Sequence, residues 1–275
     1  MSRLFSLTEF RLEVRFADME TNNIFDSHAH YDDAAFDKDR DSLLEELPRR
    51  GICNVVNCGA DLDSSRASIA LAAHYSYFYS AVGIHPECAK DAPDNYAQQL
   101  EALMIGDKVV AVGEIGLDYH FEDNAPKDVQ KAMFEEQILL AQKHNLPIIV
   151  HDRDAHGDTI ELLRKHKPSG VVHCFSGSVE MAKEVIRLGM YIGLGGAVTF
   201  KNARVPVEVA ACIPLERMLM ETDCPYMTPT PFRGKRNDST LIAYTAAKIA
   251  EIRGTTIQNI LEVTRHNAET LFRTE

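Results

Sequence analysis

The sequence predicts an α/β protein that folds as a closed (β/α)₈ TIM barrel. Short apolar runs, typical of strands, alternate eight times with helix-length segments over residues 24–275. The chain has 275 residues, the usual size of one such barrel. Five of the runs end on His, Asp or Glu, and the carboxyl ends of barrel strands meet on one face. We therefore expect one domain over residues 24–275, with its chemistry at that face.

Residues 1–23 precede the first predicted barrel strand. Phe10, Leu12, Val14 and Phe16 alternate with charged residues, a period of two that is typical of a half-buried strand. The alternative is a disordered extension without a structural role, because Met19 could serve as a start just before the first clear element. The sequence leaves both interpretations of this extension open.

The predicted strands are short apolar runs, several of them rich in β-branched residues. They occupy residues 24–30, 52–58, 77–84, 109–118, 147–151, 170–173, 190–195 and 218–223. The predicted helices lie near residues 38–50, 64–74, 96–104, 127–145, 159–166, 179–188, 206–211, 241–252 and 256–271. No Gly-x-Gly-x-x-Gly turn opens a helix, which disfavours the runner-up fold, an open doubly wound sheet with a nucleotide crevice.

The net charge of the chain is -12, from 29 basic and 41 acidic residues. This excess of negative charge argues against broad electrostatic binding to nucleic acid or to an anionic membrane, so an anionic substrate must be attracted locally. Six cysteines without a Cys-x-x-Cys pair predict reduced thiols and a cytoplasmic protein. We expect no membrane association, because no apolar stretch reaches the roughly 20 residues that cross a bilayer.

The residues that end the predicted strands form a metal-binding pattern. On a strand buried on both faces an unpaired carboxylate such as Glu114 is very costly, so Glu114 needs a cation. His28 and His30, two residues apart, point to the same side of a strand and can reach one ion. The full set of candidate ligands is His28, His30, Glu114, His151, His173 and Asp223.

The composition of this ligand set suggests which ions it holds. Imidazole and carboxylate ligands suit Zn, Mn, Fe or Mg better than Ca. Six ligands exceed a single tetrahedral shell, so we expect two divalent ions with Glu114 as the bridge. Two divalent ions carry four positive charges, and the carboxylates of Glu114 and Asp223 carry two negative charges. The pocket is therefore positively charged in a negatively charged protein. Such a pocket favours hydrolysis of an anion.

Six motifs, in chain order, resemble the TatD family of metal-dependent deoxyribonucleases. They are Asp26-Ser27-His28-Ala29-His30, Gly83-Ile84-His85-Pro86, Gly113-Glu114-Ile115-Gly116-Leu117-Asp118, Val150-His151, His173-Cys174-Phe175-Ser176-Gly177 and Glu221-Thr222-Asp223-Cys224-Pro225-Tyr226. The resemblance covers residues 24–273 and implies an amidohydrolase-type TIM barrel with two divalent ions, Mg, Mn or Zn. It assigns His28, His30, Glu114 and Asp223 to one ion, and Glu114, His151 and His173 to the other.

The family also suggests roles nearer the substrate for His85 and for the loop at residues 233–237. His85 ends a predicted strand and faces the same mouth; a hydrogen-bonded loop histidine is the alternative. Arg233, Lys235 and Arg236 place three cations within four residues, which suits phosphate contacts. A solvated charge cluster is the alternative for this loop.

Other positions are less clearly marked by the sequence. Lys201 and Arg153 are further candidates for substrate contacts. Cys174 would point away from His173 on a regular strand, which predicts a core position. The chain departs from the family at 238–239, where Asp-Ser replaces the usual Glu-Pro, and in its first 23 residues. Neither departure touches a candidate ligand.

The ligand pattern predicts a two-metal hydrolase, and the resemblance to the TatD family implies that it cleaves phosphodiester bonds of DNA, as a 3'-5' exonuclease on single strands. Glu114, Asp223 and His85 would be catalytic, with Asp223 orienting or deprotonating the attacking water. DNA is the expected partner, and no obligatory protein partner is evident. Hydrolysis of a small-molecule amide or ester, or of an aminoacyl ester on tRNA, is the alternative for the same site. The third hypothesis is a metal-containing partner protein without catalytic activity, which the complete ligand set disfavours.

Overall fold

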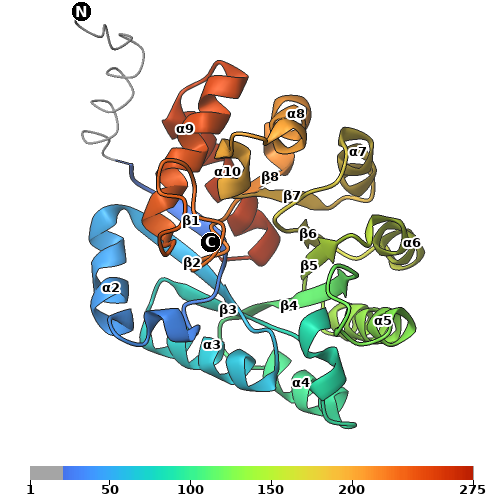
Figure 1. The fold of residues 1–275 in the computed structure, drawn as a ribbon. Coiled ribbons are helices and arrows are strands. Elements are labelled where there is room, and N and C mark those ends of the chain that lie inside the picture. The colour runs from blue at the N-terminus through green and yellow to red at the C-terminus, as the bar shows by residue number, and fades with distance from the viewer. Residues whose placement is uncertain (1–20, 275) are drawn as a thin grey trace, which may run out of the picture.

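A computed structural model describes residues 21–274 as a barrel of parallel strands surrounded by helices (Figure 1). All eight strands belong to one sheet, in the spatial order β1 to β8, and each neighbouring pair is parallel. This topology confirms the predicted (β/α)₈ barrel. The strand predicted within residues 10–16 lies outside the described residues. Among the described residues, no helix combines the length and the apolarity needed to cross a bilayer.

The strands are short and rich in Val and Ile, and five of them are buried along their whole length. They are β1 Ile24–Ala29, β2 Ile52–Cys58, β3 Phe78–Val82, β4 Val109–Asp118, β5 Ile148–Arg153, β6 Gly170–Val172, β7 Tyr191–Leu194 and β8 Met218–Met220. Burial on both faces is expected for parallel strands covered by helices outside and by side chains inside the barrel.

The helices follow the predicted alternation. The α-helices are α2 Arg40–Glu46, α3 Leu62–His74, α4 Tyr96–Met104, α5 Lys127–Lys143, α6 His156–His166, α7 Val179–Arg187, α8 Arg204–Cys212, α9 Ile242–Arg253 and α10 Ile257–Phe272. The 3₁₀ helices are η1 Ala34–Phe36, η2 Leu47–Arg50, η3 Pro86–Asp91, η4 Gly196–Thr199, η5 Leu215–Arg217 and η6 Ser239–Leu241.

Two predicted boundaries were wrong. The helix predicted over residues 38–50 is shorter, because η2 replaces its second half where Pro48 cannot donate a backbone hydrogen bond. The run predicted over residues 109–118 is confirmed, since β4 spans Val109–Asp118 and pairs with β5 up to Arg153. β8 ends at Met220, and Asp223 has a φ of 57°, so it lies in the following loop.

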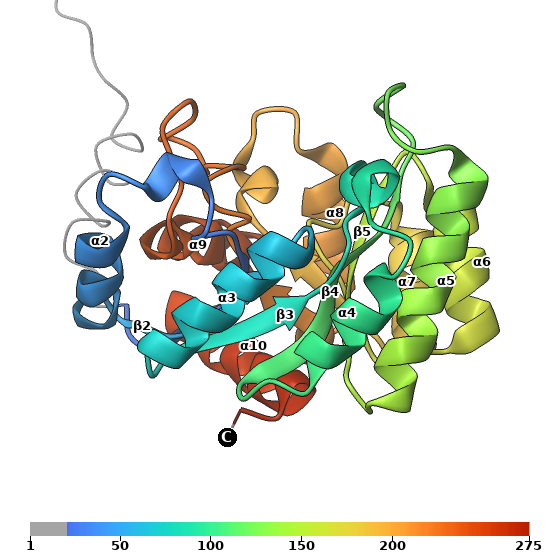
Figure 2. The same ribbon diagram turned by 90° about the horizontal axis from the view of Figure 1, so that it is seen from below.

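Helix α10 closes one end of the barrel. In Figure 2 it lies below the strands, on the opposite side from the loops that follow their carboxyl ends. Its Phe272 stacks on Phe25 of β1, with ring centroids 6.1 Å apart, and both rings are buried. Packing at this end excludes water from the barrel interior, so only the carboxyl face is left for a site.

A buried hydrogen-bond network joins the first strand to the last and closes the barrel. Ala29 bridges to Cys224, and the backbone N–H of Asp223 donates to the carbonyl of His28 at 3.0 Å. The Asp26 carboxylate accepts from Thr222 Oγ1 at 2.7 Å and from a second hydroxyl in the η6 segment. This network fixes the β1 end and the segment after β8 relative to each other.

Two glycines allow β4 to approach its neighbour β5 closely around Glu114. A Cβ added at Gly113 would lie 2.6 Å from the Cβ of Ile149. At Gly116, where φ is +146°, an added Cβ would lie 2.0 Å from the carbonyl oxygen of His151. No side chain fits at either position, so the glycines that flank Glu114 are required by the strand spacing.

We predict that Gly116→Ala lowers the free energy of unfolding by roughly 3 kcal/mol, because the methyl group meets a backbone atom and the residue must keep a positive φ. Gly189→Ala is the matched control. Gly189 also has a positive φ, of 90°, but its added Cβ meets nothing within 4 Å, so we expect a loss of about 1 kcal/mol. Urea unfolding measures the free energy of unfolding of both variants. Equal losses in the two variants would contradict the close β4–β5 approach.

Candidate metal centre

All six predicted ligands, together with His85, converge at the carboxyl ends of the strands. His28 lies on β1, Glu114 on β4 and His151 on β5, while His30, His85, His173 and Asp223 lie in the segments after β1, β3, β6 and β8. Ligand atoms from these residues form three overlapping groups within which every pair lies inside 4.8 Å. The barrel topology thus brings together residues that are up to 195 positions apart.

The carboxylate of Glu114 stands at the centre of this cluster and divides it into two halves. Its Oε2 lies 3.3 Å from His28 Nε2 and 3.4 Å from His30 Nε2. Its Oε1 lies 2.9 Å from His151 Nδ1 and 2.6 Å from His173 Nε2. Oε2 therefore faces the pair His28 and His30, whereas Oε1 faces the pair His151 and His173 and, at 3.5 Å, His85 Nε2.

Asp223 completes the half that faces Oε2. Its Oδ1 lies 3.6 Å from His28 Nε2 and 3.5 Å from His30 Nε2. The Asp223 side chain is 18% exposed, whereas that of Glu114 is 5% exposed. Asp223 is therefore the carboxylate of the cluster that solvent reaches more easily from the mouth.

Two of the histidines are oriented through their outer nitrogens. His30 Nδ1 lies 2.9 Å from the carbonyl oxygen of Cys58, which can only accept, so this nitrogen carries the proton. His151 Nε2 donates to Asp118 Oδ2 at 3.0 Å. In the neutral form of either ring the lone pair is therefore on the nitrogen that faces Glu114, the arrangement found around metal-binding histidines.

His85 has the opposite tautomer. Its Nδ1 accepts the backbone N–H of Glu87 at 3.2 Å, because His85 caps the start of η3. The proton of the neutral ring therefore lies on Nε2, which is 3.5 Å from Glu114 Oε1. His85 presents a hydrogen-bond donor to the site, whereas His30 and His151 present acceptors.

The charges within the cluster support a cation at its centre. Burial opposes ionisation of Glu114, but His173 and the other facing histidines hold its pKa well below the usual value. Burial, with His173, lowers the pKa of His28 to about 4, so this ring is a neutral donor of a lone pair. Burial also disfavours a charged His151, yet Asp118 and Glu114 raise its pKa to about 10. The ionised carboxylates of the cluster are stabilised by positive charge beside them, and a divalent ion would supply it.

The spacing of the nitrogens fits a metal shell. Two ligands at about 2.1 Å from a tetrahedral zinc ion are about 3.4 Å apart. The facing nitrogens of His28 and His30 are 3.0 Å apart, and those of His151 and His173 are 3.3 Å apart. His173 presents Nε2 to this centre, because Nε2 lies 2.6 Å from Glu114 Oε1 whereas Nδ1 lies 4.0 Å from Glu221 Oε1. The residues present therefore fit a metal centre.

Asp118 is a functional residue that the sequence interpretation missed. The motif pattern gives Asp118 no role, although the residue is fully buried and its carboxylate accepts a hydrogen bond from His151 Nε2. Its position at the end of the Gly113–Asp118 motif, four residues after Glu114, was the available signal. Cys174, predicted in the core, is partly exposed, because its backbone leaves the strand with a φ of 40°.

The predicted substrate-contact residues lie in exposed loops with different environments. Arg236 forms a bidentate ion pair with Asp39 at 2.6 and 2.7 Å, which ties the loop to the start of α2. The Arg233 guanidinium stacks 3.9 Å from the ring centroid of Phe200. In residues 21–274 no carboxylate lies within ion-pair distance of the three remaining cations, Lys201, Arg233 and Lys235.

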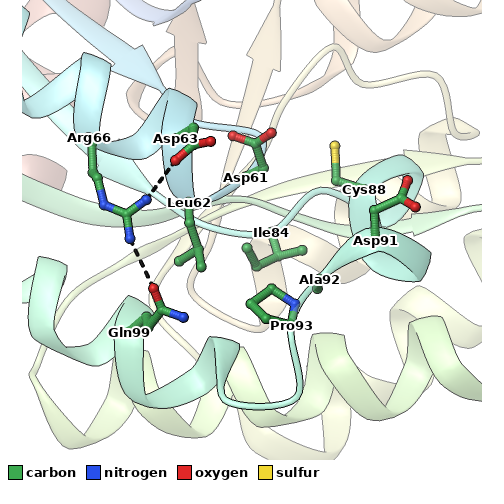
Figure 3. Close-up of a pocket in the computed structure, with 10 residues that line it drawn as sticks. All are labelled: Asp61, Leu62, Asp63, Arg66, Ile84, Cys88, Asp91, Ala92, Pro93 and Gln99. Atoms are coloured by element: carbon green, nitrogen blue, oxygen red, sulfur yellow. Dashed lines mark hydrogen bonds and ion pairs between the residues drawn. The ribbon is translucent and has the colours of Figure 1, made fainter.

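A cavity of about 370 Å³ lies between α3, η3 and α4, and none of its lining residues is a candidate ligand (Figure 3). Its polar groups already have structural roles. Arg66 is bound by Asp63 at 2.7 Å and by Gln99 at 3.0 Å, and Asp61 caps α3. Burial raises the pKa of Cys88 to about 11, so its thiol is not a nucleophile at neutral pH.

The family model described as TatD related DNase matches residues 25–273. The chain belongs to the TatD family. It shares 42% identity with the uncharacterized metal-dependent hydrolase YabD of Bacillus subtilis, over 91% of this chain and 99% of YabD. It shares 31% identity with the 3'-5' ssDNA/RNA exonuclease TatD of Klebsiella pneumoniae, over 90% of this chain and 97% of that protein.

The solved structures agree with this membership. The crystal structure of YjjV, a TatD homologue from Escherichia coli, matches with a TM-score of 0.86 and 32% identity, over 91% of this chain and 98% of YjjV. The TatD-family chain is therefore a metal-dependent hydrolase whose buried His, Glu and Asp residues could bind the metal.

We predict that Asp118→Asn weakens metal binding by about 10- to 100-fold without unfolding the protein. An amide can turn its NH₂ group toward His151 Nε2, which would move the ring proton to Nδ1 and remove the lone pair that faces Glu114. Glu101→Gln is the control, since Glu101 forms the same kind of pair with His144 at 2.7 Å away from the cluster. Competition with a fluorescent zinc chelator measures affinity. Unchanged affinity in Asp118→Asn would show that Asp118 does not orient His151.

Proposed function

We propose that the protein uses two divalent ions to hydrolyse phosphodiester bonds, removing nucleotides from the 3' end of single-stranded DNA. The observation that carries this proposal is the division of the cluster by Glu114, whose two oxygens each face a separate pair of histidines. Two-metal sites stabilise both the attacking and the leaving oxygen of a phosphoryl displacement. The name of the Klebsiella pneumoniae relative, a 3'-5' ssDNA/RNA exonuclease, supports the polarity and the substrate.

The proposed ligands follow this division. His28, His30 and Asp223 would hold one ion with Glu114 Oε2, and His151 and His173 would hold the other with Glu114 Oε1. When bound, the ions, Mg, Mn or Zn, supply positive charge for the phosphate oxygens and acidify a water molecule. The protein's part is to fix the ligand geometry, which it does through the buried β4 strand and the second nitrogens of the histidines.

Asp223 is the proposed general base. Its Oδ1 faces His28 and His30, which leaves Oδ2 to orient the attacking water and to accept its proton. Burial raises the pKa of Asp223, but the hydrogen bond to His30 and the nearby histidines together lower it below the usual value, so the carboxylate is ionised. A partly exposed, ionised carboxylate at the mouth has the properties that this role needs.

His85 is the proposed donor to the substrate. Because its Nδ1 is occupied by the Glu87 N–H, its Nε2–H points into the site beside Glu114 Oε1. A phosphate oxygen placed there would accept this hydrogen bond, and the bond would strengthen as negative charge develops in the transition state. The tautomer of His85 thus suits substrate stabilisation better than metal ligation.

The loop cations are proposed to position the strand. Lys235, Arg233 and Lys201 are exposed and without carboxylate partners in the described part of the chain, so they remain available for phosphates. We expect less from Arg236, because its guanidinium is already paired with Asp39. Local cations of this kind would offset the net charge of -12 near the substrate.

Hydrolysis of a neutral amide or ester, or of an aminoacyl ester on tRNA, by the same site is the second candidate function. A two-metal centre polarises carbonyl and phosphoryl oxygens alike. The available cations near the mouth favour the phosphate-bearing substrate, because a neutral amide would gain nothing from them.

Single-stranded DNA labelled at the 5' or the 3' end tests the proposal. With Mn²⁺ we expect the 3' label to be released first as mononucleotide, and a chelator to abolish release. Asp223→Asn should lower kcat by roughly 100-fold or more, since it removes the basic carboxylate but keeps a ligating oxygen. Metal analysis of the same preparation should still find the ion held by Glu114, His151 and His173. Turnover of an amide or ester panel without DNA cleavage would overturn the proposal.

A further inference from the structure

An exposed aromatic ring stands beside the metal centre. Phe121 is 42% exposed and lies in the loop between β4 and α5, three residues after Asp118. Figure 2 shows this loop projecting from the face where the strands have their carboxyl ends. A single exposed apolar residue is common in proteins and means little alone, so the surroundings of the ring decide its importance.

The loop that carries Phe121 is held against β5 by several hydrogen bonds. The backbone N–H of Tyr119 donates to the carbonyl of Arg153 at 2.9 Å. His120 Nδ1 lies 2.9 Å from Asp154 Oδ2, and the His120 ring meets the edge of Phe121 with centroids 4.9 Å apart. The ring is therefore positioned before any ligand arrives, which lowers the entropy lost on binding.

A cation without a carboxylate partner lies against the same ring. The Arg153 guanidinium is 4.9 Å from the Phe121 centroid. Arg153 pairs in register with Asp118 and follows the proposed ligand His151 by two residues. In residues 21–274 no carboxylate lies within ion-pair distance of Arg153. An exposed ring and an available guanidinium thus stand side by side at the edge of the metal centre.

We propose that Phe121 and Arg153 form a nucleotide subsite, in which the ring stacks on one unpaired base and the guanidinium binds an adjacent phosphate. The subsite rests on the proposed nuclease function, because the strand it holds would place its next phosphate in the metal centre. Stacking on an aromatic ring needs a base whose face is free and does not read its identity. The pair therefore selects a single strand and tolerates any sequence.

Tyr226 also has an exposed ring near the site, but its contacts among the described residues include no cation that could bind a phosphate. Tyr226 is 56% exposed and follows Asp223 by three residues. Its hydroxyl donates to Asp33 Oδ2 at 2.8 Å, so its nearest charged partner is an anion. A phosphate beside Tyr226 would be repelled, whereas one beside Phe121 would meet Arg153.

Binding of labelled single strands to chelator-treated protein tests the subsite independently of cleavage. Fluorescence anisotropy compares a normal oligonucleotide with one of the same length that lacks bases. We expect Phe121→Ala to weaken binding of the normal strand by about 10-fold and to leave the abasic strand unchanged, because only a base can stack. The Phe121→Trp variant should bind the normal strand at least as tightly as the unsubstituted protein does. Arg153→Ala should weaken both strands and reduce the dependence of binding on salt.

Ile105→Ala is the matched control, since Ile105 is 76% exposed at the end of α4 and lies on the far side from the loops. It should change neither affinity. Equal weakening of both strands by Phe121→Ala, or no weakening of the normal strand, would overturn the subsite. Base-dependent binding without metal-dependent cleavage would instead leave the subsite standing and overturn the proposed nuclease function.

Discussion

The structure depends on the placement of one carboxylate, Glu114, in the middle of a strand that is buried along its whole length. An ionised group at such a position is stable only when positive charge or donors surround it. The barrel meets this requirement by bringing histidines from the first, fifth and sixth strand ends to its two oxygens. Gly113 and Gly116 let the neighbouring strands approach closely enough for those contacts. Fold and site are therefore parts of one arrangement.

The histidines around Glu114 differ in role because their outer nitrogens have different partners. A carbonyl oxygen behind His30 and a carboxylate behind His151 turn a lone pair toward the centre. A backbone N–H behind His85 turns a proton toward it. Identical side chains thus present either a lone pair or a proton to the centre through neighbours outside the cluster, which is the basis of the two roles that we propose for them. Residue type alone does not separate the two roles.

The sequence predicted the barrel and the converging residues because both depend on local patterns: apolar runs of strand length, and His or acidic residues where the runs finish. The topology of a closed parallel barrel then brings those positions together. It did not predict that β8 stops at Met220, since that end depends on pairing with the neighbouring strand β7. The support of His151 by Asp118 and the pairing of Arg236 with Asp39 also depend on contacts between distant segments.

The central claim is that Glu114 divides a single cluster into two adjoining metal sites. Titration of metal-free protein with Mn²⁺, followed by electron paramagnetic resonance, tests it most directly. We expect saturation at two ions per chain and a spectrum of two exchange-coupled ions, because one carboxylate would bridge them. Glu114→Gln should lose the coupled spectrum while the protein remains folded. Saturation at one ion per chain, with the spectrum of an isolated ion, would contradict the account.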